Sequence, residues 1–274
     1  MSASLPTLRD HLPEGVPVPV HWLHAQGLSS ALVHHYVRSG WLQALPGQAY
    51  LRPGPPLTWP AALYAAQQVG LPVHVGHLSA LALQGLSHYQ PLGGGEQWHL
   101  YLPLRPPTWL AGLPFSGAWH REQVFYEEAP PARLAPATLR TPTQDLPASR
   151  KLAVMPAPRL PWLVFISAPE RAALELAAGL TRGGSWDMAY ETFTGLTMLR
   201  PAVVRELLLA CTRVVTRRVF LHLAHASDHA WLEHLDLSGV DLGTGDRQVV
   251  PQGRLDPLWR ITVPRLGQEA EHGF

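Results

Sequence analysis

The densest group of side chains able to bind a metal ion lies between residues 222 and 234. On one continuous helix, His222, His225 and His229 would share a face, and three imidazoles can form a zinc site. Residues 226–228 read Ala-Ser-Asp, which is typical of a turn and would separate these rings. Histidine is also frequent throughout the chain, with 15 copies. We therefore expect no metal site here. A metal-dependent enzyme that uses the His222–His234 cluster remains an alternative class.

No other motif supports catalysis. Residues 241–246, Asp-Leu-Gly-Thr-Gly-Asp, resemble a phosphate loop but read more simply as a β-turn, and residues 93–95 lack the lysine of a Walker loop. The single cysteine, Cys211, lies in an apolar segment that disfavours a reactive thiolate, and it excludes an intrachain disulfide. We expect no catalytic residue and no cofactor.

Overall charge does not mark a nucleic-acid-binding protein, because 21 basic and 20 acidic side chains leave a net charge of +1. Residues 1–90 hold three arginines, two acids and eight histidines. The one local basic cluster covers residues 200–218, and it is interpreted either as a solvated helix face beside Glu206 or as a second positive surface for nucleic acid or a toxin. The side chains assigned to that surface are Arg205, Arg213, Arg217 and Arg218.

Residues 21–53 show the element order of a winged helix-turn-helix. The pattern predicts a short helix over 21–25, a turn, and a second helix that begins after Ser29 as N-cap and ends before Gly40. Residues 41–45 and 49–52 then alternate like two strands around a Pro-Gly-Gln turn. In such a unit the second helix presents a free polar face to the major groove of DNA.

The second helix has the two faces that this task requires. Apolar side chains gather on one side, and Ser30, Ala31, His34, His35 and Arg38 fall on the other. The predicted DNA-binding residues are Ser29, Ser30, His34, His35, Arg38, Gln48 and Arg52, the last two on the wing. The paired histidines add little attraction for phosphate, since imidazole is mostly neutral at neutral pH. A small helical domain with a solvated polar face is the alternative.

The rest of the chain indicates an α+β protein of two domains, residues 1–92 and 93–274. Helices are expected at 58–68, 77–86, 169–178, 186–196 and 201–211, strands at 97–102 and 163–166, and a hairpin pair within 240–263. The proline-rich residues 128–161 are interpreted as a loop or linker. No apolar run is long enough to span a membrane, and the N-terminus lacks the features of a signal peptide, so a cytoplasmic protein is expected.

Several phrases, in order, resemble the AbiEi family of antitoxin-type transcriptional regulators. They are GLSSALVHHYVRSGWLQALPGQAYLRPG, TWPAALYAAQ and VHVGHLSALALQGLSHY, then SWDMAYETFTGLTMLRPAVVRELLLAC and RRVFLHLAHASDHAWLEHLD. The resemblance covers residues 5–264, is weaker over 91–160, and implies an N-terminal winged helix-turn-helix with accessory helices and a mixed α/β C-terminal antitoxin domain.

The resemblance also implies a function. Such a chain is expected to bind double-stranded operator DNA, with inverted repeats, and to repress its own operon. It is expected to act as the antitoxin of a type IV toxin-antitoxin system against a nucleotidyltransferase-type toxin without requiring a stable complex, in phage defence or genome maintenance. A plain winged-helix transcription factor without a toxin partner is the alternative.

Overall fold

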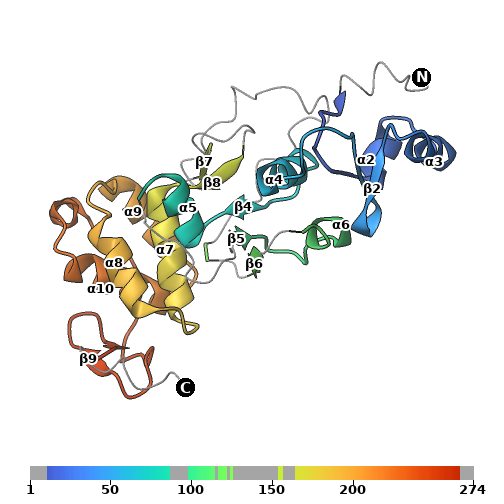
Figure 1. The fold of residues 1–274 in the computed structure, drawn as a ribbon. Helices are drawn as coiled ribbons and strands as arrows, with labels where there is room; N and C mark the ends of the chain where they lie inside the picture. Colours follow the sequence, from blue (N-terminus) through green and yellow to red (C-terminus); the bar gives the residue numbers. More distant parts are fainter. Residues whose placement is uncertain are drawn as a thin grey trace.

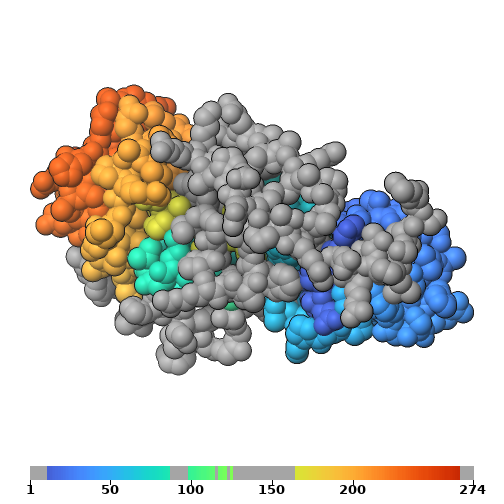
Figure 2. Space-filling model, turned by 90° about the horizontal axis from the view of Figure 1, so that it is seen from above, coloured from blue at the N-terminus to red at the C-terminus, as the bar shows by residue number. Residues whose placement is uncertain are grey.

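The computed structural model describes residues 11–86, 98–114, 117–121, 124–125, 154–156 and 164–265. Figure 1 shows an elongated arrangement in which an N-terminal unit and a group of C-terminal helices lie on either side of a central sheet. The view from above in Figure 2 also places the residues of these two parts at opposite ends. In the described residues, no helix is long and apolar enough to cross a membrane.

The N-terminal unit consists of two helices and a small antiparallel sheet. Its elements are β1 (Val18–Pro19), α2 (Val20–Ala25), α3 (Ser30–Arg38), β2 (Gln43–Leu45), the 3-10 turn η1 (Pro46–Gln48) and β3 (Ala49–Leu51). The strands are ordered β1-β3-β2, with Val18 opposite Tyr50 and Ala44 opposite Tyr50 on its other side. This is the helix, turn, helix and hairpin order that the sequence predicts.

The central sheet has five short strands in the order β6-β5-β4-β8-β7. Helix α4 (Trp59–Gln68) precedes β4 (His74–Val75), α5 (His77–Leu83) follows it, and α6 (Thr108–Ala111) lies between β5 (Trp98–Tyr101) and β6 (Gly117–His120). The strands β7 (Val154–Pro156) and β8 (Phe165–Ser167) complete the sheet. β4 pairs antiparallel with β5 and parallel with β8, and β5 pairs parallel with β6. The sheet thus joins strands from both sides of the expected boundary at residues 92 and 93, which lies outside the described residues, and the two-domain division stays a prediction.

The C-terminal part is a helical cluster with a small hairpin. It contains α7 (Pro169–Leu180), α8 (Trp186–Thr194), α9 (Pro201–Ala210), α10 (Val214–Ala226) and η2 (Ala230–His234), followed by β9 (Arg254–Asp256) and β10 (Ile261–Val263). Helix α7 packs against both α5 and α10 and is buried along nearly its whole length. A helix buried all round belongs to the centre of a core rather than its surface. The core therefore runs without interruption from the sheet into the C-terminal helices.

Most of the expected helices are present within a few residues of their predicted ends. Two departures are clear: Val214–Ala226 form α10, which the expected helices did not include, and residues 154–156, inside the proline-rich segment 128–161, form β7. β7 pairs antiparallel with β8. The other residues of that segment lie outside the described part of the chain.

Candidate nucleic-acid interface

Helix α3 begins after a serine cap and ends before a glycine, as the sequence predicts. The Ser29 hydroxyl oxygen accepts a hydrogen bond from the backbone N–H of Leu32 at 3.3 Å. Gly40 has a φ of +74°, the left-handed conformation that commonly terminates a helix. The cap satisfies one of the N–H groups that a helix start leaves without a partner.

The two faces of α3 are separated as predicted. Val33 and Tyr36 are buried against the core of the N-terminal unit. The opposite arc is exposed and carries Ser29, Ser30, Ala31, His34, His35 and Arg38. The polar arc is therefore available to a partner, and its contact with DNA stays a prediction.

Helix α2 extends this surface with two histidines that the sequence analysis did not select. The Ser30 hydroxyl lies 3.3 Å from Nε2 of His24, which places the exposed His24 beside the first turn of α3. His21 lies three residues earlier, on the same side of α2, and is also exposed. Helical spacing was the signal that could have found them.

The tip of the predicted wing, which is the turn η1 at Pro46–Gln48 and is called the wing tip below, packs against α6. Gly47 has a φ of +69°, and a Cβ built on it would lie 2.5 Å from the backbone nitrogen of Trp109. An open groove of about 300 Å³ lies beside this contact, between the start of α2, the wing tip and the start of α6, with His21, Gln48 and Thr108 in its lining. Gln48 itself is exposed, so its contact with DNA stays a prediction. The side of the wing tip at Gly47 is covered by α6 and is not available to DNA.

The expectation that Arg52 contacts a phosphate is wrong for this structure. The Arg52 side chain is 10% exposed. It donates to the carbonyl of Leu12 at 2.9 Å and to Oε1 of Glu14 at 2.6 Å. The guanidinium also lies over the Trp41 ring, 5.7 Å from its centroid. These bonds connect β3 and the residue after it to residues 12–14. The charge of Arg52 is balanced by Glu14 within the protein.

Two of the four arginines expected on the second basic surface are buried. Arg217 donates to the carbonyls of Leu208, Cys211 and Asp241. Arg218 is 2% exposed and donates to the carbonyls of Leu242, Gly243, Gly245 and Arg260. Both project from α10 into the loop over residues 241–245, so their predicted surface role is incorrect.

The other two arginines of that set differ from each other. Arg205 donates to a carboxylate oxygen of Asp236 at 3.1 Å and to the carbonyl of Ser238 at 3.0 Å. Arg213 is exposed at the N-cap position of α10. The expected cluster is therefore not one continuous basic surface.

The histidines between 222 and 234 do not converge. α10 ends at Ala226, and His229 Nε2 donates to the carbonyl of Phe193 at 2.6 Å. His222 forms hydrogen bonds through Nε2 with the Tyr190 hydroxyl at 2.7 Å and through Nδ1 with Oδ2 of Asp256 at 2.5 Å. Within the described residues, no group of three His, Cys, Asp or Glu side chains is arranged to hold a metal ion. The arrangement gives no support to the metal-enzyme alternative.

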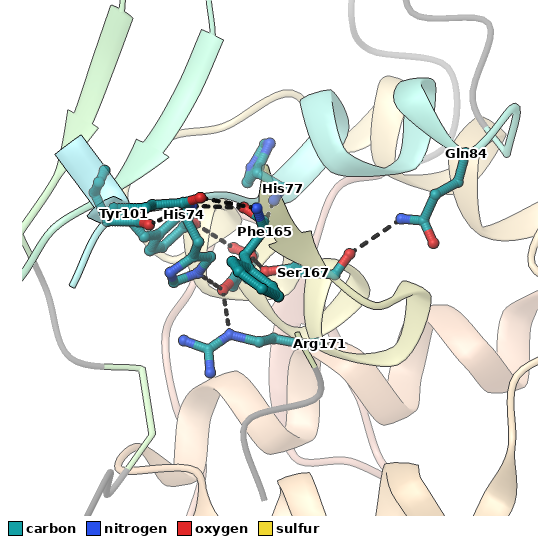
Figure 3. Close-up of polar contacts among 10 residues, drawn as sticks. His74, His77, Gln84, Tyr101, Phe165, Ser167 and Arg171 are labelled. Carbon is teal, nitrogen blue, oxygen red and sulfur yellow. Dashed lines mark hydrogen bonds and ion pairs between the residues drawn. The ribbon is translucent and has the colours of Figure 1, made fainter. Parts of the chain in front are cut away.

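The most elaborate polar cluster surrounds Glu175, which no motif indicated. This fully buried carboxylate accepts from Arg171 Nε at 2.8 Å, from the Ser167 hydroxyl at 2.9 Å and from the backbone N–H of His77 at 3.0 Å, and it lies 3.0 Å from His74 Nε2. Figure 3 shows His74, Ser167 and Arg171 converging from β4, β8 and α7. The cluster joins the central sheet to the C-terminal helices.

Burial raises the pKa of the Glu175 carboxyl and lowers that of the nearby His99 imidazole. Burial opposes ionisation of Glu175, but the hydrogen bond and charge of His74 together with Arg171 outweigh it and lower its pKa to about 2. Nearby, His99 and His120 lie 2.9 Å apart through Nδ1 and Nε2. Burial, reinforced by His120, lowers the pKa of His99 to about 4. Glu175, His99 and His120 therefore serve as structural residues where the central sheet meets the C-terminal helices.

Comparison with known proteins places the chain in a family. A family described as "Transcriptional regulator, AbiEi antitoxin N-terminal domain" matches residues 1–92, and one described as "Transcriptional regulator, AbiEi antitoxin, Type IV TA system" matches residues 105–264. The chain belongs to the AbiEi family. As an AbiEi-family protein it is a transcriptional regulator and antitoxin of a type IV toxin-antitoxin system, which implies DNA and a toxin as partners.

A solved structure supports the fold of this AbiEi-family chain. The RV2827C protein of Mycobacterium tuberculosis aligns with a TM-score of 0.53 at 15% sequence identity, covering 90% of this chain and 85% of the other. At that identity the likeness concerns the fold alone. No curated protein matches the chain.

Proposed function

We propose that this AbiEi-family chain binds the operator of its own operon through α3 and represses transcription. The observation that carries the proposal is the exposed polar arc of α3 opposite a buried apolar face. Short serine side chains near the start of the helix suit close approach to base edges, and Arg38 near its end suits a phosphate. The α2 residues beside this arc widen the surface.

Gel shifts with the upstream promoter of the operon test the DNA-binding proposal. Specific binding by the full chain is expected, and failure to bind even at low salt would overturn it. Arg38→Ala should weaken binding to all sequences and reduce the salt slope by about one phosphate contact. Arg247→Ala is the matched control, because Arg247 is also exposed but lies in the C-terminal part.

We further propose that the chain opposes a nucleotidyltransferase-type toxin in the cytoplasm without catalysing a reaction itself. A co-expression rescue assay tests this: the wild-type chain should restore growth of cells that express the neighbouring toxin gene. A full-chain variant with Ser30→Ala and Arg38→Ala should lose repression but keep the rescue, if DNA binding and antitoxicity are separate. An operon without a nucleotidyltransferase gene would instead favour a plain winged-helix regulator.

A further inference from the structure

The surface around α3 has very little permanent charge for a DNA-binding surface. Among the described residues 11–86, the only Asp, Glu, Lys or Arg side chains are Glu14, Arg38 and Arg52. Arg52 is bound to Glu14, so this pair contributes no net charge. Arg38 is then the one exposed arginine in this part of the chain. DNA affinity at physiological salt depends largely on cations that neutralise phosphates.

Four exposed imidazoles lie on and beside the polar arc of α3. His34 and His35 lie on the exposed arc of α3, with His34 one turn before Arg38. His21 and His24 lie on the exposed side of α2, and His24 contacts Ser30 at the start of α3. Imidazole is the side chain that gains a positive charge between about pH 8 and pH 5.

Among the described residues 11–86, the neighbours of these imidazoles include little that would compete with DNA for them. From the neighbouring elements, His11 is engaged with Gln26 at 3.3 Å, and Tyr36 packs against Trp41 on the buried side of α3. From the wing, Arg52 holds the carboxylate of Glu14, and Tyr50 is the remaining titratable side chain. Within the described range 11–86, none of the four exposed histidines forms an ion pair, and the one acid there, Glu14, is held by Arg52, so a phosphate would be the anion that these histidines meet.

We propose that His21, His24, His34 and His35 bind DNA phosphates as imidazolium ions, so that DNA binding takes up protons. The inference rests on the proposed function and adds its regulation: affinity rises as pH falls through the neutral range. A phosphate beside an imidazole favours the protonated form, and by linkage the protonated form favours the phosphate. The chain would then hold DNA weakly at alkaline pH through Arg38 and more strongly in mildly acidic conditions.

Titrations of the full chain with mixed-sequence double-stranded DNA, followed by fluorescence anisotropy, test the inference. Between about pH 8 and pH 6, the dissociation constant should fall roughly tenfold per pH unit for each net proton taken up. The salt slope should steepen by about 0.9 for each new imidazolium–phosphate contact. Circular dichroism at both pH values verifies that the chain stays folded.

Two sets of variants separate this surface from other histidines. Replacing the four histidines together by asparagine should abolish both the pH dependence of the dissociation constant and that of the salt slope. The control, His225→Asn with His234→Asn, removes two equally exposed imidazoles from the C-terminal part and should leave both effects intact. Binding that is independent of pH, or a pH effect that survives the fourfold change, overturns the inference alone. Absence of binding at every pH and low salt overturns the proposed function as well.

Discussion

Arg217 and Arg218 act in this chain as donors to backbone carbonyls. Arg218 bonds carbonyls of the loop over residues 242–245 together with that of Arg260, and Arg217 bonds three other carbonyls. A guanidinium has five N–H donors in a fixed plane, so it can satisfy several buried acceptors at once. The sequence shows the local density of arginine but not which carbonyls surround it, because the loop comes back to α10 only in the folded chain.

The loss of one such arginine should be costly. Arg218→Met keeps much of the side-chain volume but removes the donor of four partly buried carbonyls, which lose less than the roughly 1–3 kcal/mol of a fully buried unsatisfied group. We expect the free energy of unfolding, measured by urea denaturation, to fall by about 1–3 kcal/mol. Arg213→Ala, at an exposed position, is the control and should change it by less than about 0.5 kcal/mol. Equal effects would contradict the structural role of Arg218.

Arg52 and Arg38 should separate stability from DNA binding. Arg52→Met removes the bonds to Leu12 and Glu14 and should lower the free energy of unfolding by about 1–3 kcal/mol, while the salt slope of DNA binding by the folded variant stays unchanged. Arg38→Ala should reduce the salt slope of DNA binding and leave the free energy of unfolding nearly unchanged. A reduced slope in the Arg52 variant, measured at a temperature where it is folded, would return Arg52 to the interface.

At the scale of elements, local signals were sufficient for the helix pair and insufficient for the sheet. The Ser29 cap, Gly40 and the polar arc of α3 depend on neighbours within a few residues, and the sequence predicts each of them. The pairing of Val75 with Ile166 joins strands far apart in sequence, and no periodicity records such a partner. His21 and His24 were missed although their three-residue spacing within the predicted helix 21–25 puts them on one side, because only the second helix was searched for a polar face.

The contact between the wing tip and α6 should be sensitive to a single methyl group. Gly47→Ala would add a strained positive φ and a Cβ against the backbone of Thr108 and Trp109, where atoms lie at 2.5–2.6 Å. Gly40→Ala is matched, since Gly40 also has a positive φ but nothing within 4 Å of its Cβ position. We expect the Gly47 variant to be less stable than the Gly40 variant by about 1–3 kcal/mol in urea denaturation. Equal losses would show that the wing tip is free of α6.

At the scale of the whole molecule, the Glu175 cluster and the histidines beside it should make stability depend on pH. The pKa of His99 falls from 6.5 to about 4 on folding, so the unfolded chain takes up a proton first and stability declines as pH falls from 6.5 towards 4. The pKa of Glu175 falls from 4.5 to about 2, so its contribution is present above pH 4.5 and is lost as pH falls to 2.

Both contributions point the same way, and the chain should unfold more easily in acid. His99→Phe preserves a ring in the stack with His77 and removes the titrating group. The difference in the free energy of unfolding between about pH 7 and pH 5 should shrink by on the order of 2 kcal/mol. His225→Phe, at an exposed site, is the control. An unchanged difference in the His99 variant would show that this histidine is not the source.

The position of α6 gives the regulator a mechanical property. The helix occupies the connection between β5 and β6, and its first residues form the surface on which the wing tip rests. The strands that carry α6 also carry His99, His120 and Tyr101, close to Glu175 and the C-terminal helices. A ligand or toxin that displaced β5 and β6 would also displace α6, on which the turn at residues 46–48 rests, without contacting α3. Binding near the C-terminal helices would then change the affinity of the N-terminal unit for DNA.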